Sequence, residues 1–203
     1  MGSVDANTDH ARQDIDQAIS VGFDAFALNV GRPAEPWAIS TVEQLFDYAG
    51  SKGGGFKLFF SFDMHQEGSI AAHRVLLDRF RDHPAHLRYG EGDRPVLSSF
   101  GGGNLGPDVW RDLRQNAGLY LIPNLEADGN YYGNPSAFFG AWRDAVDGVF
   151  SWETAWPAAS ESPTNVSSVQ DEHVKAAADA AGKAYMMGKQ ARARTSMDFG
   201  YRN

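Results

Sequence analysis

The chain has 203 residues, of which 42% are hydrophobic and 22% are charged, enough to bury the core of a single globular domain. Its formal net charge of -8 and its scattered lysines and arginines argue against nucleic acid as a partner. No apolar run reaches the roughly 18 to 20 residues of a membrane span. The polar start MGSVDANTDHARQD lacks the apolar core of a signal peptide, and without cysteine the sequence excludes disulfides and thiolate metal sites.

Amphipathic and apolar segments alternate along the chain. The predicted helices are residues 9–21, 40–52, 69–81, 107–116, 137–146 and 167–181, and the predicted strands are 25–30, 56–63, 95–100, 119–126, 148–156 and 184–188. Ser40 is the expected N-cap of the second helix, with Glu43 completing a capping box. The result is six helix–strand units at intervals of roughly 30 residues.

This alternation predicts an α/β fold. Continuous apolar strands such as FKLFF are typical of parallel strands that helices cover. A (β/α)8 TIM-type barrel needs eight strands and typically about 250 residues, so we expect an incomplete barrel that lacks a first and a closing strand. Residues 1–188 form this partial barrel, and residues 189–203 form a tail that we expect to be irregular. The strands are expected to be neighbours in one parallel sheet, in chain order.

Polar residues close several of the predicted strands. Asp63 ends FSFD, Glu126 and Asp128 follow IPN, Glu153 ends FSWE, and Asn29 closes the first strand. In a parallel barrel the carboxyl ends of the strands line the active site. A single acid at such a place can simply cap the next helix or pair with a base. Four converging positions favour a site.

Aromatic residues accompany these acids on strand ends and the loops after them. They are Trp37, Tyr131, Tyr132, Trp152 and Trp156. Their flat faces suit sugar rings, although core packing is an equal alternative for Trp152. Trp110 and Trp142 fall in predicted helices and are expected to pack. Acids beside aromatics favour glycoside hydrolysis, in which one carboxyl group protonates the leaving oxygen and another activates water or attacks carbon.

Two other kinds of site are less well supported. Asp63, His65 and Glu67 form D-x-H-x-E, but the other histidines fall in helices or their flanks, so we expect no metal and no cofactor. The glycines 101–103 could cradle a phosphate, as in an unrelated barrel enzyme that acts on a small phosphorylated substrate. Because no lysine or arginine lies between Ser98 and Trp110, a tight turn is the preferred interpretation.

A family resemblance lies in six segments, which are DIDQAISVGFDAFALNVG, FKLFFSFDM, RPVLSSFGGG, LYLIPNLE, DGVFSWETAWP and KAYMMG. In this order, from about Asp14 to Gly188, they resemble the fungal α-1,3-glucanases (mutanases) of glycoside hydrolase family 71. The resemblance implies a (β/α)8 catalytic domain that hydrolyses α-1,3-glucan of fungal cell walls with inversion. It also implies an extracellular or cell-wall location, with a polysaccharide as the partner.

The resemblance also implies site residues. In relatives an acid follows PNL and a second acid comes three residues later. Glu126 matches the first acid, Gly129 occupies the second position, and Asp128 lies one residue earlier. Either the loop shifts so that Asp128 serves, or the pair is broken and the chain is a catalytically incompetent glucan-binding fragment.

The resulting hypothesis makes Glu126 the acid and Asp128 the base. Asp63 and Glu153 are the reserves, which otherwise bind sugar hydroxyls or hold the protonation states of the pair. The expected substrate-binding residues are Asn29, Trp37, Tyr131, Trp152 and Trp156.

Overall fold

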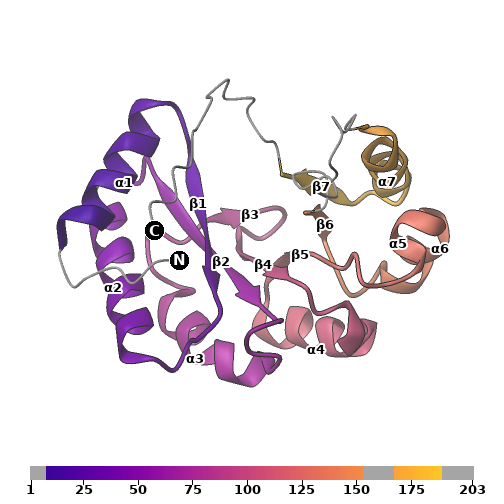
Figure 1. Ribbon diagram of the computed structural model, residues 1–203, viewed down its shortest axis with the longest axis horizontal. Helices are drawn as coiled ribbons and strands as arrows, with labels where there is room; N and C mark the ends of the chain where they lie inside the picture. The colour runs from indigo at the N-terminus through magenta and orange to yellow at the C-terminus, as the bar shows by residue number, and fades with distance from the viewer. Residues whose placement is uncertain (1–7, 153–166, 189–203) are drawn as a thin grey trace, which may run out of the picture.

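The computed structural model describes residues 8–152 and 167–188, and an arc of strands runs through it (Figure 1). In chain order its elements are α1 (Thr8–Ser20), β1 (Ala25–Val30), α2 (Pro36–Ser51), β2 (Lys57–Asp63), α3 (Ile70–Phe80), β3 (Arg88–Tyr89), β4 (Arg94–Phe100), the 3₁₀ turn η1 (Gly103–Leu105), α4 (Pro107–Ala117), β5 (Tyr120–Pro123), α5 (Asn130–Gly133), α6 (Pro135–Trp142), β6 (Gly148–Ser151), α7 (Val169–Ala180) and β7 (Ala184–Met187). Each predicted helix and strand is present, and β3 and α5 are additions that the sequence did not predict.

The strands form an incomplete α/β barrel. β1, β2, β4 and β5 pair in parallel in that order, and β6 pairs in parallel with β7. The short β3 folds back on β4 as an antiparallel neighbour. Helices α1 to α4 lie along the outside of the arc, and α5 to α7 flank β6 and β7 (Figure 1). In the described part of the chain, no helix is long and apolar enough to cross a membrane.

One expectation about the sheet was wrong, because β5 and β6 do not share a ladder. Pro123 in β5 has no N–H to donate. The N–H of Leu121 instead donates to the side chain of Asp147 (3.0 Å), while the N–H of Asp147 donates to the carbonyl of Leu121 (2.9 Å). At the other end of the gap, the Asn124 amide donates to the carbonyl of Phe150 (3.0 Å). Side chains, together with the backbone bond from Asp147 to Leu121, therefore take the place of a ladder between the two sheets.

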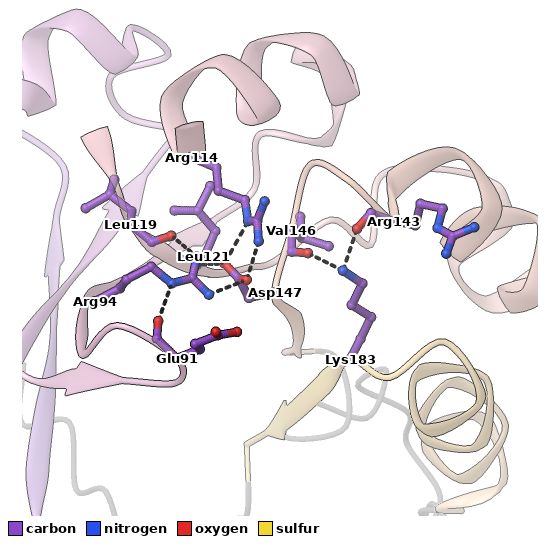
Figure 2. A network of polar contacts seen from close by, with 9 residues as sticks. All are labelled: Glu91, Arg94, Arg114, Leu119, Leu121, Arg143, Val146, Asp147 and Lys183. Carbon is purple, nitrogen blue, oxygen red and sulfur yellow. Dashed lines mark hydrogen bonds and ion pairs between the residues drawn. The ribbon is translucent and has the colours of Figure 1, made fainter. Parts of the chain in front are cut away.

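Asp147 is the centre of a polar cluster at the amino ends of the strands (Figure 2). Its buried carboxylate accepts paired hydrogen bonds from the guanidinium groups of Arg94 and Arg114, with a shortest distance of 2.7 Å in each pair. Lys183, just before β7, donates to the carbonyls of Arg143 and Val146 in the same region. These contacts connect β4, α4, β6 and β7, which are far apart in the sequence.

Side chains on the two faces of the strands enter two separate cores. Leu58, Phe60 and Phe62 of β2 belong to the larger core beneath the helices. Phe59, between them, packs with Val96 and Tyr120 in the smaller core on the other face, which is the barrel interior. Because side chains alternate along a strand, the interior face also takes Asn29, Asp63 and Phe100 at the carboxyl ends of their strands. The alternation of side chains therefore brings these strand-end residues onto the same face of the sheet, as expected.

The start of α2 differs from the prediction. The helix begins at Pro36 with Glu35 as its N-cap, so the predicted capping box of Ser40 and Glu43 was wrong. Proline suits the first helical turn because its fixed φ angle is helical and its missing N–H would have no partner there. In α3 the side chain of Ser69 caps the N–H of Ala72 (3.3 Å), and the helix begins within one residue of the prediction.

Candidate active site

Glu126 lies three residues beyond β5 and is half-buried. Its carboxylate accepts hydrogen bonds from the side-chain amide of Asn124 (2.8 Å) and from the backbone N–H of Trp152 (2.8 Å). The hydroxyl of Tyr132 donates to the same carboxylate. All three of these donors are neutral. A carboxyl group that neutral donors hold in place at a strand end is suited to giving or taking a proton.

Asn124 organises the surroundings of Glu126. Besides donating to Glu126 and to the carbonyl of Phe150, it accepts a hydrogen bond from the N–H of Gly101 at its side-chain oxygen (3.3 Å). Its own N–H donates to the carbonyl of Ser99 (3.1 Å). The buried Asn124 thus ties the carboxyl ends of β4, β5 and β6 together. The sequence contained a signal for it, since a polar residue directly after a buried strand is costly without partners.

A row of aromatic rings crosses the strand ends. The ring of Phe100 lies 4.9 Å from that of His65 and 4.8 Å from that of Trp152, measured between ring centroids. Trp152 also contacts Phe150 at 5.5 Å. His65 and Phe100 were not predicted as site residues, although Phe100 follows from the alternation of β4. The row connects the end of β2 with the end of β6, where the N–H of Trp152 donates to Glu126.

The second part of the candidate site is a pocket of about 430 Å³ beside β1. Asn29, Trp37 and Asp63 all line it, together with Arg32 and Gln66. Trp37 is 47% exposed, so a face of its ring is available to a ligand. Three of the predicted site residues are therefore brought together here.

Asp63 is held by the turn that follows β2. Its Oδ1 accepts hydrogen bonds from the N–H groups of His65 (3.1 Å) and Gln66 (3.2 Å), while Oδ2 has no hydrogen-bond partner among the described residues. Glu67 accepts from the N–H of Ser69 (2.9 Å), so D-x-H-x-E shapes a turn before α3. Among residues 8–152 and 167–188, no three histidine, aspartate or glutamate side chains gather as metal ligands would.

Asp128 is less suited to chemistry than the sequence suggested. One of its oxygens accepts from the N–H of Asn130 (2.9 Å) and the other from the indole N–H of Trp142 (2.9 Å). Trp142 is buried in α6, as expected for a packing residue. Both oxygens of Asp128 therefore take part in holding α5 and α6, and the position predicted for the base is occupied by a structural contact.

The two neighbouring tyrosines, of which Tyr131 was predicted to bind substrate, both contact other residues of the protein. Tyr131 is fully buried and its hydroxyl lies 2.7 Å from that of Ser151, so the expected stacking of Tyr131 on a sugar does not fit. Tyr132 instead reaches Glu126. Burial raises the pKa of Tyr132, and the hydrogen bond and the charge of Glu126 raise it further. Its phenol is consequently a neutral donor at physiological pH.

The remaining predicted positions divide into two groups. Glu153 and Trp156 lie outside the described residues, as does the segment 189–203. The glycine run forms a tight turn, because Gly102 has φ of 106° and a Cβ atom there would lie 2.6 Å from the ring of Trp110. Trp110 is buried and donates to the carbonyl of Gly102 (3.0 Å), which makes it a packing residue as predicted.

The curated relatives are fungal glucan hydrolases. The chain is 33% identical over 163 residues to the glucan endo-1,3-alpha-glucosidase agn1 of Schizosaccharomyces pombe, covering 71% of this chain and 34% of that protein. It is 28% identical over 150 residues to a mutanase of Penicillium rubens, covering 72% of this chain and 30% of that protein. The chain thus spans about a third of the length of these relatives.

The fold has solved counterparts as well. The GH99 endo-alpha-mannosidase of Bacteroides thetaiotaomicron superposes with a TM-score of 0.62 at 16% sequence identity, covering 90% of this chain and 53% of that one. The complex of this enzyme with Bis-Tris propane gives a TM-score of 0.63. At this identity the likeness shows the fold alone. The sequence profile of glycosyl hydrolase family 71 matches residues 1–203, and the chain belongs to this family.

Proposed function

We propose that the protein hydrolyses α-1,3-glucan, the substrate class that the names of its fungal relatives indicate, and that it acts outside the cell or in the cell wall. The observation that carries this proposal is the setting of Glu126. It lies at the carboxyl end of a barrel strand, held by neutral donors, beside the aromatic row of His65, Phe100 and Trp152. Membership of the family argues against the alternative of an unrelated barrel enzyme for phosphorylated substrates.

Glu126 is the acid in the proposed reaction. Its Oε1 already accepts hydrogen bonds from Tyr132 and from the N–H of Trp152. Oε2 accepts from the side-chain amide of Asn124 (2.8 Å), and the proton of the acid form passes to the glycosidic oxygen as the bond to the anomeric carbon breaks. Trp37 and Trp152 provide flat faces for glucosyl rings on either side.

An inverting reaction also needs a base that holds water on the opposite face of the sugar, about 6.5 to 9.5 Å from the acid. Both oxygens of Asp128 are engaged with α5 and α6, so we assign the role of the base to Asp63 or Glu153 instead. Asp63 is the choice among the described residues, because Oδ1 is fixed by two backbone N–H groups and the residue lines the pocket with Asn29 and Trp37. Glu153 is the alternative to Asp63.

The test is the release of reducing ends from α-1,3-glucan by the wild-type chain and single variants. Glu126→Gln is expected to lower kcat by about 10²- to 10⁴-fold, as is Asp63→Asn. Asp128→Asn is expected to keep kcat within a few fold. Glu172→Gln is the matched control, because Glu172 is an exposed acid whose side chain bonds only Ser168 among the described residues. Full activity of Glu126→Gln would disprove the proposed role.

A second candidate function is glucan binding without turnover, and Gly129 is the observation that favours it. The family resemblance implies a second acid at this position, whereas Asp128, one residue earlier, is engaged elsewhere. Gly129 has φ of -59° and ψ of -19°, and no atom lies within 4 Å of where its Cβ would be. The backbone there therefore suits a residue with a side chain, and its Cβ atom would meet no neighbour.

One experiment distinguishes the two functions. A binding protein would retain insoluble α-1,3-glucan without releasing reducing ends, and Gly129→Glu would then confer turnover. Gly129→Gln is the control, because it has the same size without the carboxyl group. Release of reducing ends by the wild type excludes the second function.

A further inference from the structure

A chain of hydroxyl groups lies on the helix-facing side of β6 and β7, and the mechanism above does not use it. The hydroxyl of Ser151 lies 2.7 Å from that of Tyr131 and 3.0 Å from that of Tyr185. The hydroxyl of Tyr185 lies 2.5 Å from Oδ1 of Asp171. The chain therefore runs from α5 through both strands to the first turn of α7.

Asp171 ends this chain in an unusual setting. It is only 3% exposed, and within the described residues its Oδ2 is buried without a hydrogen-bond partner. Its place in the first turn of α7 favours a carboxylate there, since the amino end of a helix carries partial positive charge. Burying a carboxylate with a single donor is nevertheless costly, and an apolar residue would pack more cheaply. Packing alone does not explain this residue.

The position of Asp171 decides the direction of the hydroxyl protons. A phenol has one proton, so Tyr185 can donate to Asp171 or to Ser151 but not to both. The carboxylate is the stronger acceptor, and the proton of Tyr185 points to Asp171. Ser151 then donates to the oxygen of Tyr185 and accepts from Tyr131. Every proton in the chain is turned toward Asp171.

Two residues of this hydroxyl chain are sequence neighbours of groups that donate to Glu126. Ser151 is followed by Trp152, whose N–H donates to Glu126. Tyr131 is followed by Tyr132, which also donates to Glu126, and the two rings contact each other at 4.8 Å. Two of the three described donors on Glu126 are thus attached to residues whose hydroxyl groups Asp171 orients.

We propose that Asp171 is a positioning residue for the reaction at Glu126. Through Tyr185 and Ser151 it fixes the segment that carries Trp152 and the ring that supports Tyr132, and so sets how firmly Glu126 holds its proton. This inference rests on the proposed function for its effect on turnover. Among residues 8–152 and 167–188, the titratable groups that face these hydroxyl groups are Glu126, Tyr131 and Tyr132, and Tyr185 of β7, while Glu172 and His173 of α7 are exposed.

The test uses Asp171→Leu, Asp171→Asn and Ser151→Ala in the full chain, with Glu172→Gln as control. Asp171→Leu removes the acceptor and puts an apolar side chain of similar size in its place. We expect kcat to fall about tenfold or more, with KM within about twofold of the wild type. Asp171→Asn keeps a carbonyl that can accept from Tyr185, so it restores most of the activity. Ser151→Ala breaks the chain but leaves the charge, and it should match Asp171→Leu.

A second measurement does not depend on turnover. NMR titration of the Glu126 side chain, assigned with Glu126→Gln, should show a shifted midpoint in Asp171→Leu and Ser151→Ala and an unshifted one in Glu172→Gln. If the wild type releases no reducing ends, the proposed function fails while this titration still decides the inference. Unchanged kcat and an unchanged Glu126 midpoint in both variants would overturn it. If Asp171→Leu does not fold, Ser151→Ala alone decides.

Discussion

Asp147 and Glu126 are carboxylates at opposite ends of the strands, and their surroundings differ in one respect. Asp147 accepts hydrogen bonds from two guanidinium groups and a backbone N–H. The donors to Glu126 among the described residues are an amide, a phenol and a backbone N–H. Cationic donors hold a carboxylate in its charged form by direct attraction, whereas the described donors to Glu126 fix its position without adding a positive charge.

The difference matches the division of labour in βα barrels, where the amino ends of the strands serve stability and the carboxyl ends serve chemistry. Burial by itself would raise the pKa of Asp147, but the hydrogen bonds from Arg114, Arg94 and the N–H of Leu121 together lower it. The Asp147 cluster should therefore govern stability, and the Glu126 cluster should govern turnover. Each of the two clusters can be disrupted by its own substitution.

The largest change in stability is expected from Asp147→Asn. Removing the charge leaves Arg94 and Arg114, each about a quarter exposed, without their anion. We expect a loss of about 3 kcal/mol in the free energy of unfolding, at the low end for a broken buried ion pair. Urea unfolding measures it. Asp144→Asn, an exposed acid three residues away, is the control and should change stability by less than about 0.5 kcal/mol. Equal effects in the two variants would contradict the account.

A smaller effect is expected in alkali, at the opposite cluster. Burial raises the pKa of Tyr131, Tyr132 and Tyr185 above the ordinary value of 10.0. Because the unfolded chain loses these protons first, stability is complete below pH 10 and falls as the pH rises above it. Tyrosinate absorbance should appear for these residues only together with unfolding, and Tyr185→Phe should reduce the alkaline loss. Ionisation of all tyrosines in the folded protein would rule this out.

Acid should act on the Asp147 cluster instead. The pKa of Asp147 is lowered from 3.8, so the unfolded state binds its proton first as the pH falls. The contribution of Asp147 is complete above 3.8 and is lost as the pH falls through its folded-state value. Thermal unfolding at a series of pH values should show this loss in the wild type and not in Asp147→Asn. Parallel curves for the two proteins would count against it.

The smallest effect concerns the pocket. Trp37→Ala should raise KM for soluble α-1,3-gluco-oligosaccharides about fivefold with little change in kcat, because an exposed ring contributes roughly 1 kcal/mol to stacking. Val109→Ala, at another exposed apolar position, is the control. An unchanged KM would remove Trp37 from the substrate site.

Local patterns predicted most of the fold. The strand at 25–30 matches β1 at both ends, and the burial of Trp110 was also predicted. The absence of a ladder between β5 and β6 was not predicted. It depends on the contact of Asp147 with Arg94 across 53 residues, and no local sequence pattern predicts such a pair.

The sequence predicted which polar residues follow the strands, and Glu126 does lie in the loop just after β5, while its role stays a prediction. The roles of the residues on the four-residue helix α5 could not be predicted, because that helix turns Tyr131 inward and brings Tyr132 to Glu126. The engagement of Asp128 with Trp142 depends on the same helix and on α6. Residues in such short loops take their roles from packing that the sequence pattern does not show.

The most direct test measures α-1,3-glucan hydrolysis and unfolding together for the wild type, Glu126→Gln and Asp147→Asn. At a temperature where all three are folded, Glu126→Gln should lose at least about 100-fold in kcat and unfold like the wild type. Asp147→Asn should keep kcat within a few fold and unfold at lower urea concentration. Normal turnover in Glu126→Gln, or a loss of turnover in folded Asp147→Asn as large as in Glu126→Gln, would contradict the account.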